Sequence, residues 1–234
     1  MKIFKYTPIQ YFRAGIGLCK KLVAQFIGMC FYKRRYLRGK EFSSYKYTSG
    51  WRWVMECFFI QKILGYQRHI PFPVSFRMQV MNWEHIMFHV DDLSNFQKGG
   101  SYFQAAADAY IRIGHGTYIA PNVGIITANH DLNDLSRPAP GKDVNIGDNC
   151  WIGMNSVLLP GVTLGEHTIV GAGSVVTKSF PEGNCVIAGN PAKIIKHLSS
   201  MNKNSYNTNS QHVTPPIILC NKDLTRERDR SIAA

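Results

Sequence analysis

His130 is the residue of this sequence best suited to acid–base chemistry at neutral pH. It stands in Asn129-His130-Asp131, at the start of a polar, proline-punctuated stretch that runs from Asp131 to Asn145. The ordinary pKa of a histidine side chain lies close to neutrality, so the ring can take up and release a proton under physiological conditions. A histidine at the root of a long connecting loop is therefore a candidate general base.

A six-residue repeat surrounds this candidate and must position it. From Ile146 to Thr177 each block of six opens with an aliphatic residue, a glycine usually follows, and a small residue stands four places on. Similar blocks begin at Ile113, Ile119 and Ile125. In such a repeat each block forms one short strand and a corner, and three blocks close one triangular coil. The small inward residues are Cys150, Ser156, Val162, Thr168 and Ser174.

This phase predicts an all-β fold, namely a parallel β-helix whose coils stack along one axis. We expect the aliphatic residues to fill a narrow prism, the glycine to allow the tight corner, and a small residue to fit the remaining inward position. Ile146 lies 21 residues after Ile125, which is not a multiple of six, so residues 131–145 must leave the coil as a loop. Ordinary short strands in a sandwich are the alternative, and the unbroken phase argues against them.

Composition divides the 234 residues into three parts. We expect an N-terminal extension over 1–75, the β-helix over 76–196 and a polar, disordered tail over 197–234. Residues 1–68 hold 14 of the 27 Lys and Arg residues but only two of the acidic ones, so the net charge of +12 arises there. This asymmetry suggests an anionic partner, and peripheral contact with an anionic membrane is one such hypothesis. The alternatives are simple solvation of a surface and packing of this region on the rest of an assembled trimer.

A basic amphipathic helix is expected near the start of the chain. Thr7 suits an N-cap, Pro8 the first helical position and Gln10 a capping box. Downstream, basic side chains fall on one face and apolar ones on the other, the latter being Ile9, Phe12, Ile16, Cys19, Val23, Phe26, Ile27 and Cys30. We see no secretory signal or bilayer-spanning stretch, and the six cysteines lack metal-ligand spacing, so a cytoplasmic location is expected.

Histidines elsewhere in the chain could suggest a metal. His85 and His89 have the spacing of two ligands on one helix face, but no third ligand follows at a helpful distance in the sequence. His115, His130 and His167 lack the paired spacing that a zinc site at a trimer interface requires. We therefore expect no metal, and an ordinary early coil around His85 and His89.

Several short motifs resemble those of hexapeptide-repeat O-acetyltransferases of the maltose and galactoside acetyltransferase type, especially those of surface-polysaccharide biosynthesis. The resemblance covers about residues 102–196. The motifs are Ile119-Ala120-Pro121-Asn122-Val123, Asn129-His130-Asp131, Asn149-Cys150-Trp151-Ile152-Gly153, Pro160-Gly161-Val162, Gly171-Ala172-Gly173-Ser174-Val175-Val176-Thr177-Lys178 and Ala188-Gly189-Asn190-Pro191-Ala192-Lys193. The resemblance implies a left-handed β-helix assembled as a homotrimer, with acetyl-CoA between neighbouring prisms and a sugar or glycan precursor as acceptor.

The resemblance also implies roles for individual residues. His130 matches the catalytic histidine, which would remove a proton from the acceptor hydroxyl so that the hydroxyl oxygen attacks the thioester directly. Asp131 and Asp108 are the candidates to orient the His130 ring. The residues that match cofactor-binding positions are Ala172, Thr177, Lys178, Lys193 and Lys196. The acceptor-binding candidates are Asp108, Asn129 and Asp131.

Two departures from the family pattern leave the substrate open. Met154 stands where a serine follows Trp-Ile-Gly in relatives, and the segment before Asp108 differs. Lys193 and Lys196 replace the arginines often found there, so they retain a point charge but not bidentate contact. The alternatives are an antibiotic-inactivating acetyltransferase, a γ-type carbonic anhydrase and a catalytically silent trimeric scaffold. Neither nucleotidyl transfer nor a nucleic-acid partner is expected.

Overall fold

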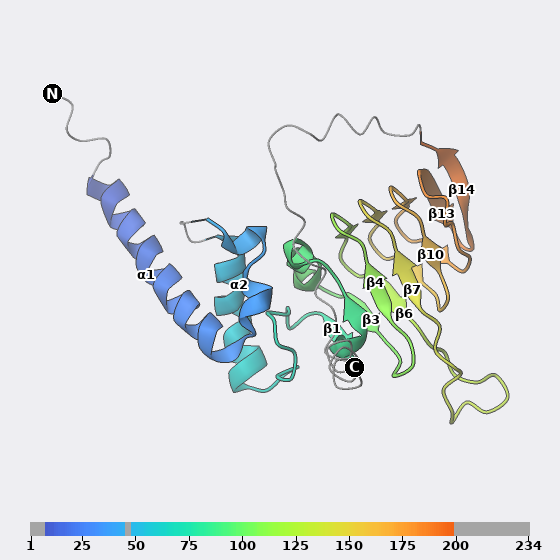
Figure 1. Ribbon diagram of the computed structural model, residues 1–234, viewed down its shortest axis with the longest axis horizontal. Helices are drawn as coiled ribbons and strands as arrows, with labels where there is room; N and C mark the ends of the chain where they lie inside the picture. Colours follow the sequence, from blue (N-terminus) through green and yellow to red (C-terminus); the bar gives the residue numbers. More distant parts are fainter. Residues whose placement is uncertain (1–7, 45–47, 199–234) are drawn as a thin grey trace, which may run out of the picture. The chain divides into compact units, whose positions relative to one another are not determined.

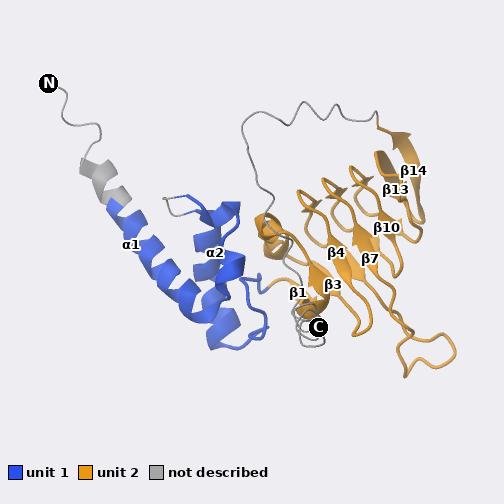
Figure 2. Ribbon diagram, in the orientation of Figure 1, with its two compact units in different colours: residues 1–76 blue, residues 77–234 orange. Residues whose placement is uncertain are grey.

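The computed structural model describes residues 8–44 and 48–198, with side chains from residue 15 onward. The chain divides into two compact units, 1–76 and 77–234 (Figure 2). The predicted N-cap Thr7 and the predicted tail from residue 199 lie outside the described residues. Helices make up unit 1, and the strands of the described chain lie in unit 2 (Figure 1).

Unit 1 is built on two packed helices. Its elements are α1 (Pro8–Phe31), the 3-10 turns η1 (Arg34–Leu37) and η2 (Lys40–Phe42), α2 (Ser49–Phe58) and the π-helix η3 (Phe59–Ile63). Pro8 opens α1 as predicted, because the first helical position has no use for a backbone N–H. Aromatic rings fill the core, with the Phe42 and Trp51 centroids 5.1 Å apart and those of Tyr36 and Phe72 4.9 Å apart.

The apolar stripe predicted for α1 is largely exposed. Among its members with described side chains, those exposed to solvent are Ile16, Cys19, Val23, Phe26 and Cys30. The small residues Ala24 and Gly28 face the core of unit 1 instead. A side-chain Cβ at Gly28 would lie 3.0 Å from the end of the Leu37 side chain, so this side of α1 packs closely on its neighbours.

Unit 2 is a parallel β-helix with three sheets. The first sheet contains β1 (Gln79–Met81), β3 (Tyr102–Gln104), β6 (Gly124–Ile126), β9 (Val157–Leu158) and β12 (Val175–Val176). The second contains β2 (Ile86–Met87), β4 (Ile111–Ile113), β7 (Val144–Ile146) and β10 (Thr163–Leu164). The third contains β5 (Tyr118–Ile119), β8 (Trp151–Ile152), β11 (Ile169–Val170), β13 (Cys185–Gly189) and the antiparallel β14 (Ala192–His197).

The inward positions of the prism are those predicted from the repeat. The aliphatic residues that open the blocks and the small residues four places on are all buried. Buried hydroxyls bond to the backbone of the preceding corner: Ser156 Oγ donates to Gly153 O at 2.6 Å, and Ser174 Oγ donates to Gly171 O at 2.6 Å. A small side chain is therefore required for volume, and a hydroxyl there leaves no unpaired polar atom.

The glycines at the second position of the six-residue blocks were predicted to allow the tight corner, but the structure shows a different reason for them. A Cβ at Gly147 would lie 2.6 Å from Glu166 N, and one at Gly153 would lie 2.6 Å from Val170 O, so the backbone of the next coil leaves no room. The corner itself falls two residues later, where φ is positive. The residues with positive φ at this place are Asn149, Asn155, Gly161, His167 and Gly173. His167 is thus a corner residue of the coil.

The ends of the repeat also differ from expectation. The prediction of an ordinary early coil is wrong at His85 and His89, because 3-10 turns η4 (Trp83–His85) and η5 (Val90–Gln97) interrupt the first coil. The predicted loop is shorter than 131–145, because buried Val144 already pairs in β7 and its N–H donates to Tyr110 O.

Within the described chain, no helix has the length and apolarity needed to cross a membrane.

Candidate active site

His130 lies where the chain leaves the first sheet, beyond the end of β6. It forms an isolated antiparallel bridge with Pro138, and Ala139 N–H donates to Asn129 O at 2.8 Å. Asp131 N–H donates to Arg137 O at 2.9 Å. The base of the loop is therefore a short hairpin that projects from the prism (Figure 1), and it holds His130 on ordered backbone.

One ring nitrogen of His130 is held by the loop. Nδ1 lies 2.9 Å from Leu135 O, and a carbonyl oxygen can only accept a hydrogen bond. Nδ1 therefore carries the proton of the neutral ring, which leaves a lone pair on Nε2. The residue is exposed to solvent. This arrangement leaves His130 with a free proton-accepting nitrogen on an exposed residue.

The two carboxylates predicted to orient His130 bond elsewhere. Asp131 Oδ1 accepts from Asn133 N–H at 2.8 Å, and Asp108 Oδ2 accepts from Gly141 N–H at 3.0 Å. Both carboxylates therefore shape the loop rather than the histidine. The orienting group is the carbonyl of Leu135, which sequence reasoning missed because a backbone oxygen has no residue-type signal.

Asp134 fixes the turn that presents the Leu135 carbonyl. Its carboxylate accepts from Ser136 Oγ at 2.6 Å, from Ser136 N–H at 3.1 Å and from Arg137 Nε at 2.7 Å. These bonds lower the pKa of the Asp134 carboxyl below its ordinary value, and the bond from the Ser136 hydroxyl contributes most. Leu132, at the tip of the same loop, is 93% exposed.

A second acidic residue fixes the return of the loop to the coil. Asp143 accepts a hydrogen bond from Tyr110 N–H at 2.8 Å and pairs closely with Arg112, which also donates to Asn145 Oδ1 at 3.1 Å. Burial raises the pKa of the Asp143 carboxyl, but the bonds from Arg112 and Tyr110 outweigh burial and hold the pKa below its ordinary value. Both ends of the loop are thus tied down.

The fold brings together some of the predicted site residues and separates others. Asp108, His130, Thr177 and Lys178 follow strands of the first sheet and so share one corner of the prism. Adjacent coils are about 4.8 Å apart, and the strand before Thr177 lies two coils beyond the strand before His130. The two residues are therefore separated by about 10 Å along the axis of the prism. Ala172 lies on the corner that enters the first sheet, and the exposed Lys193 and Lys196 lie on β14 in the third sheet.

Met154 shares the corner of Ala172. It is exposed, and its backbone carbonyl accepts a hydrogen bond from Gly173 N–H at 2.8 Å. The carbonyl is thereby used to join two coils. The side chain is directed away from the buried interior, so the departure from serine changes the surface at this corner and leaves the core unchanged.

The contacts that the histidines make differ from those that their spacing in the sequence suggested. His85 Nδ1 lies 3.1 Å from Ala109 O, and the ring stacks on Tyr110. His89 instead lies beside His115 and Asp92, and in the part of the chain that the structure describes these three form the group that could hold a metal ion. His130 and His167 are not members of it.

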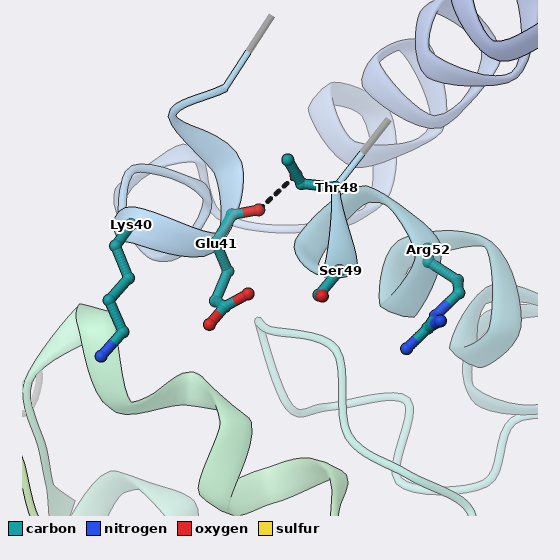
Figure 3. A pocket seen from close by; sticks show the side chains of 5 residues that line it. All are labelled: Lys40, Glu41, Thr48, Ser49 and Arg52. Atoms are coloured by element: carbon teal, nitrogen blue, oxygen red, sulfur yellow. Dashed lines mark hydrogen bonds between the residues drawn. The ribbon is translucent and has the colours of Figure 1, made fainter. Parts of the chain in front are cut away.

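Unit 1 has a surface hollow of its own. It is lined by Lys40, Glu41, Thr48, Ser49 and Arg52, and the side chains of Lys40, Glu41 and Arg52 point to the same side (Figure 3). The Thr48 hydroxyl donates to the backbone carbonyl of Glu41. No residue predicted to bind cofactor or acceptor lines this hollow.

Comparison with known proteins gives the class of this repeat. Residues 143–178 match the family model described as bacterial transferase hexapeptide (six repeats). This match, together with the named acetyltransferases that follow, confirms the predicted resemblance to hexapeptide-repeat acetyltransferases.

Two curated relatives and one solved structure illustrate the match. YJL218W of Saccharomyces cerevisiae, itself named an acetyltransferase only by inference, is 40% identical over 131 residues, which are 52% of this chain and 65% of that protein. Galactoside O-acetyltransferase of Escherichia coli is 37% identical over 102 residues, which are 42% of this chain and 50% of the enzyme. A galactoside acetyltransferase solved with coenzyme A is 34% identical, with a TM-score of 0.39 over 42% of this chain and 50% of that chain. The chain thus spans about half to two thirds of the length of the first curated relatives.

Proposed function

We propose that this protein is an acetyl-CoA-dependent O-acetyltransferase that acts on a sugar hydroxyl in surface-polysaccharide biosynthesis. The observation that carries the proposal is the bond between His130 Nδ1 and the Leu135 carbonyl, which leaves Nε2 as a proton acceptor at the root of the loop. The curated relatives named as galactoside O-acetyltransferases support the reaction class.

The proposed reaction needs no covalent intermediate on the enzyme. His130 Nε2 takes the proton of the acceptor hydroxyl while the hydroxyl oxygen attacks the thioester carbonyl carbon of acetyl-CoA. The carbon–sulfur bond then breaks, and the proton passes from Nε2 to the sulfur of CoA. Leu135 O holds the ring throughout and stabilises the positive charge on the protonated imidazole.

Five exposed residues, on two corners of the prism and on β14, could bind the acyl donor acetyl-CoA. Lys178 follows β12, and Lys193 and Lys196 lie on β14, so each presents an ammonium group that can attract a CoA phosphate. Ala172 and Thr177 are exposed and small enough to let an extended ligand lie against the prism. We assign donor binding to these five residues and acceptor binding to Asp108, Asn129 and Asp131.

A left-handed homotrimer completes the proposal. Tyr118 and Trp151 are paired in register on the third sheet and both are exposed, as are Leu132 and Leu135 on the loop. Burying these apolar side chains against neighbouring subunits would remove them from water and bring the corner of Ala172 in one prism close to His130 of another. Light scattering should give a trimer that Trp151→Asp dissociates and Phe26→Asp does not; a monomeric wild type would contradict this arrangement.

The catalytic assignment is tested by release of free CoA from acetyl-CoA with a panel of sugars. His130→Ala and His130→Asn should each lower the rate about 100- to 10,000-fold, because neither side chain can accept the proton. His167→Ala is the matched control, since that histidine belongs to a corner of the same prism. Equal turnover by wild type and both His130 variants would remove His130 from the mechanism. Turnover with an antibiotic hydroxyl and none with sugars would favour the antibiotic-inactivating alternative.

We also propose that unit 1 contacts an anionic membrane surface. Its exposed apolar side chains include Leu18, Leu22, Phe26 and Met29 on α1 and Phe59, Ile63 and Leu64 at the π-helix. Residues 1–68 carry the whole positive excess of the chain. Apolar side chains with basic neighbours match the interface of an anionic bilayer, where each Lys or Arg contributes about 1 kcal/mol near the surface.

Co-sedimentation of the full chain with vesicles tests this contact. Binding to phosphatidylserine-containing vesicles should fall with salt, and Phe26→Asp should weaken it several-fold. Ile195→Asp is a matched control, because Phe26 and Ile195 are both 65% exposed but lie in different units. No binding at low salt, or equal loss in both variants, would rule the contact out.

A further inference from the structure

Two histidines and an aspartate from separate coils meet at the start of the β-helix. His89 is the N-cap of η5, Asp92 lies at a kink inside η5, and His115 lies in the turn between β4 and β5. One possible ligand atom from each residue lies within 4.8 Å of the other two. The rings of His89 and His115 are 4.2 Å apart and meet edge to face.

Among the three residues only His115 is exposed to solvent. His89 is 5% exposed and Asp92 is 4% exposed, whereas the side chain of His115 is 51% exposed. An ion could therefore enter past His115 and be held by two groups that the fold has already positioned. Asp92 also accepts a hydrogen bond from Gly116 N–H at 2.8 Å, which fixes its carboxylate beside the His115 turn.

The His89 ring has an unsatisfied polar atom. Its Nδ1 accepts a hydrogen bond from Asp91 N–H at 3.2 Å, while its buried Nε2 has no hydrogen-bond partner among the described residues. Leaving a buried ring nitrogen unpaired is unfavourable, because the nitrogen has lost its hydrogen bond to water and gained none in return. While Nδ1 accepts this bond, Nε2 carries the proton of the neutral ring, so a cation binds Nε2 only when the proton moves to Nδ1 and faces the Asp91 carboxylate, whose Oδ2 lies 3.7 Å from Nδ1. Nε2 then has the cation as its partner.

Neighbouring carboxylates make the cluster attractive to a cation. Asp91 Oδ2 lies 3.7 Å from His89 Nδ1 and 3.9 Å from His115 Nε2, so it can serve as a further oxygen ligand or as the acceptor for a ring N–H. Asp148 lies close as well, since its Oδ1 accepts from His115 N–H at 2.7 Å. The acidic groups outnumber the two imidazoles.

We propose that His89, Asp92 and His115 form a binding site for a divalent transition-metal ion, with zinc as the representative. Two imidazole nitrogens and a carboxylate oxygen are the ligands that zinc prefers, and hard cations such as Mg²⁺ favour sites made of oxygen alone. The bound ion joins η5 to the turn after β4 and so fastens the irregular first coil to the next one. It lies apart from the corner of His130, so the site does not depend on the proposed reaction.

Zinc titration of the full chain after chelator treatment tests the proposal. Calorimetry should give one zinc ion per chain and thermal unfolding should shift upward with zinc, while millimolar Mg²⁺ should neither bind nor compete. His115→Ala should lower the zinc affinity at least about 10-fold. His115 is chosen because its half-exposed side chain can be removed without opening a cavity in the core.

Two matched variants complete the test. His167→Ala removes a histidine from a corner of the same prism, and His130→Ala removes the proposed catalytic base; both should bind zinc as tightly as the wild type. Replacing zinc with Co²⁺ should give a visible absorption band that His115→Ala abolishes. Equal zinc affinity in wild type and His115→Ala, or no zinc binding by the wild type, would overturn the site.

Discussion

In the β-helix each inward side chain stacks on its equivalent in the next coil, whereas in unit 1 the core is made of aromatic rings that meet in pairs at varied angles. Phe42 and Trp51 meet nearly perpendicular, while Tyr36 and Phe72 are tilted. A Cβ added at Gly147 or Gly153 of the prism would meet backbone atoms of the next coil. A Cβ added at Gly28 of unit 1 would meet the ends of side chains, which can move.

This difference explains where function can arise. In the periodic part of the prism the backbone groups of one coil bond to those of its neighbours, so few of them remain for a ligand. Both proposed sites lie where the phase is interrupted, at the loop that carries His130 and at the 3-10 turn that carries His89 and Asp92. Unit 1 has no periodic constraint and instead leaves a large apolar surface on α1 exposed.

The largest effect is expected from a single methyl group added inside the repeat. Gly153→Ala places a Cβ 2.6 Å from Val170 O, a backbone atom that can move only with its coil, so we expect a loss of about 3 kcal/mol or more in unfolding free energy. Gly124→Ala is the control in the same prism, because its Cβ would make ordinary contacts at 3.6 Å with Val157. Urea unfolding followed by circular dichroism measures both.

The corresponding change in unit 1 should be tolerated. A Cβ at Gly28 would meet the side-chain ends of Leu37 at 3.0 Å and Trp51 at 3.3 Å, which can shift. Alanine also favours a helix by about 1 kcal/mol over glycine, which offsets the crowding. A loss as large for Gly28→Ala as for Gly153→Ala would break the distinction between the two units.

A smaller effect is expected from Gln61→Met in unit 1. The buried Gln61 side chain accepts from Tyr32 OH at 3.1 Å and from Val74 N–H at 3.3 Å, and its amide donates to Phe72 O at 3.0 Å. Methionine keeps the volume but leaves these groups unpaired, at a cost of about 2–3 kcal/mol. Hydrogen exchange should rise around residues 59–76 and stay unchanged in the β-helix. Faster exchange throughout the prism would show that the two units are energetically coupled.

The fold could be predicted where the sequence is periodic. The six-residue period identified the coils and their inward residues. The prism takes an aliphatic side chain at the first position of each block and has room only for a small one four places on. Unit 1 has no comparable period: α2 continues into a π-helix whose Gln61 bonds to Tyr32 and to the segment from Ile70 to Val74, and no residue pattern signals these partners. The role of the second-place glycines was also missed, because it depends on the backbone of the adjacent coil.

The candidate site was predictable to the extent that it depends on side-chain identity. His130 was found from its place at the break in the repeat. The Leu135 carbonyl was not, because any residue type provides a carbonyl and only the turn set by Asp134 directs it to the ring. His89 and His115 could not be paired in advance, because their contact depends on 3-10 turns in a coil where the repeat is absent.

The least perturbing test of the comparison uses one buried thiol in each unit. Burial, with the nearby Glu56 charge, raises the pKa of Cys57 to about 12, and burial raises that of Cys150 to about 11. At pH 8 only about one Cys150 in 1,000 is a thiolate, so both thiols should resist alkylation in the native protein while the exposed Cys19 and Cys30 react. Mass spectrometry with increasing urea should show Cys57 labelled before Cys150, because the core of unit 1 contains aromatic side chains that meet at varied angles, whereas Cys150 Sγ donates to Gly165 O of the next coil. Labelling in full denaturant gives the reference for each thiol. Simultaneous labelling would mean that the aromatic unit is no easier to open than the prism.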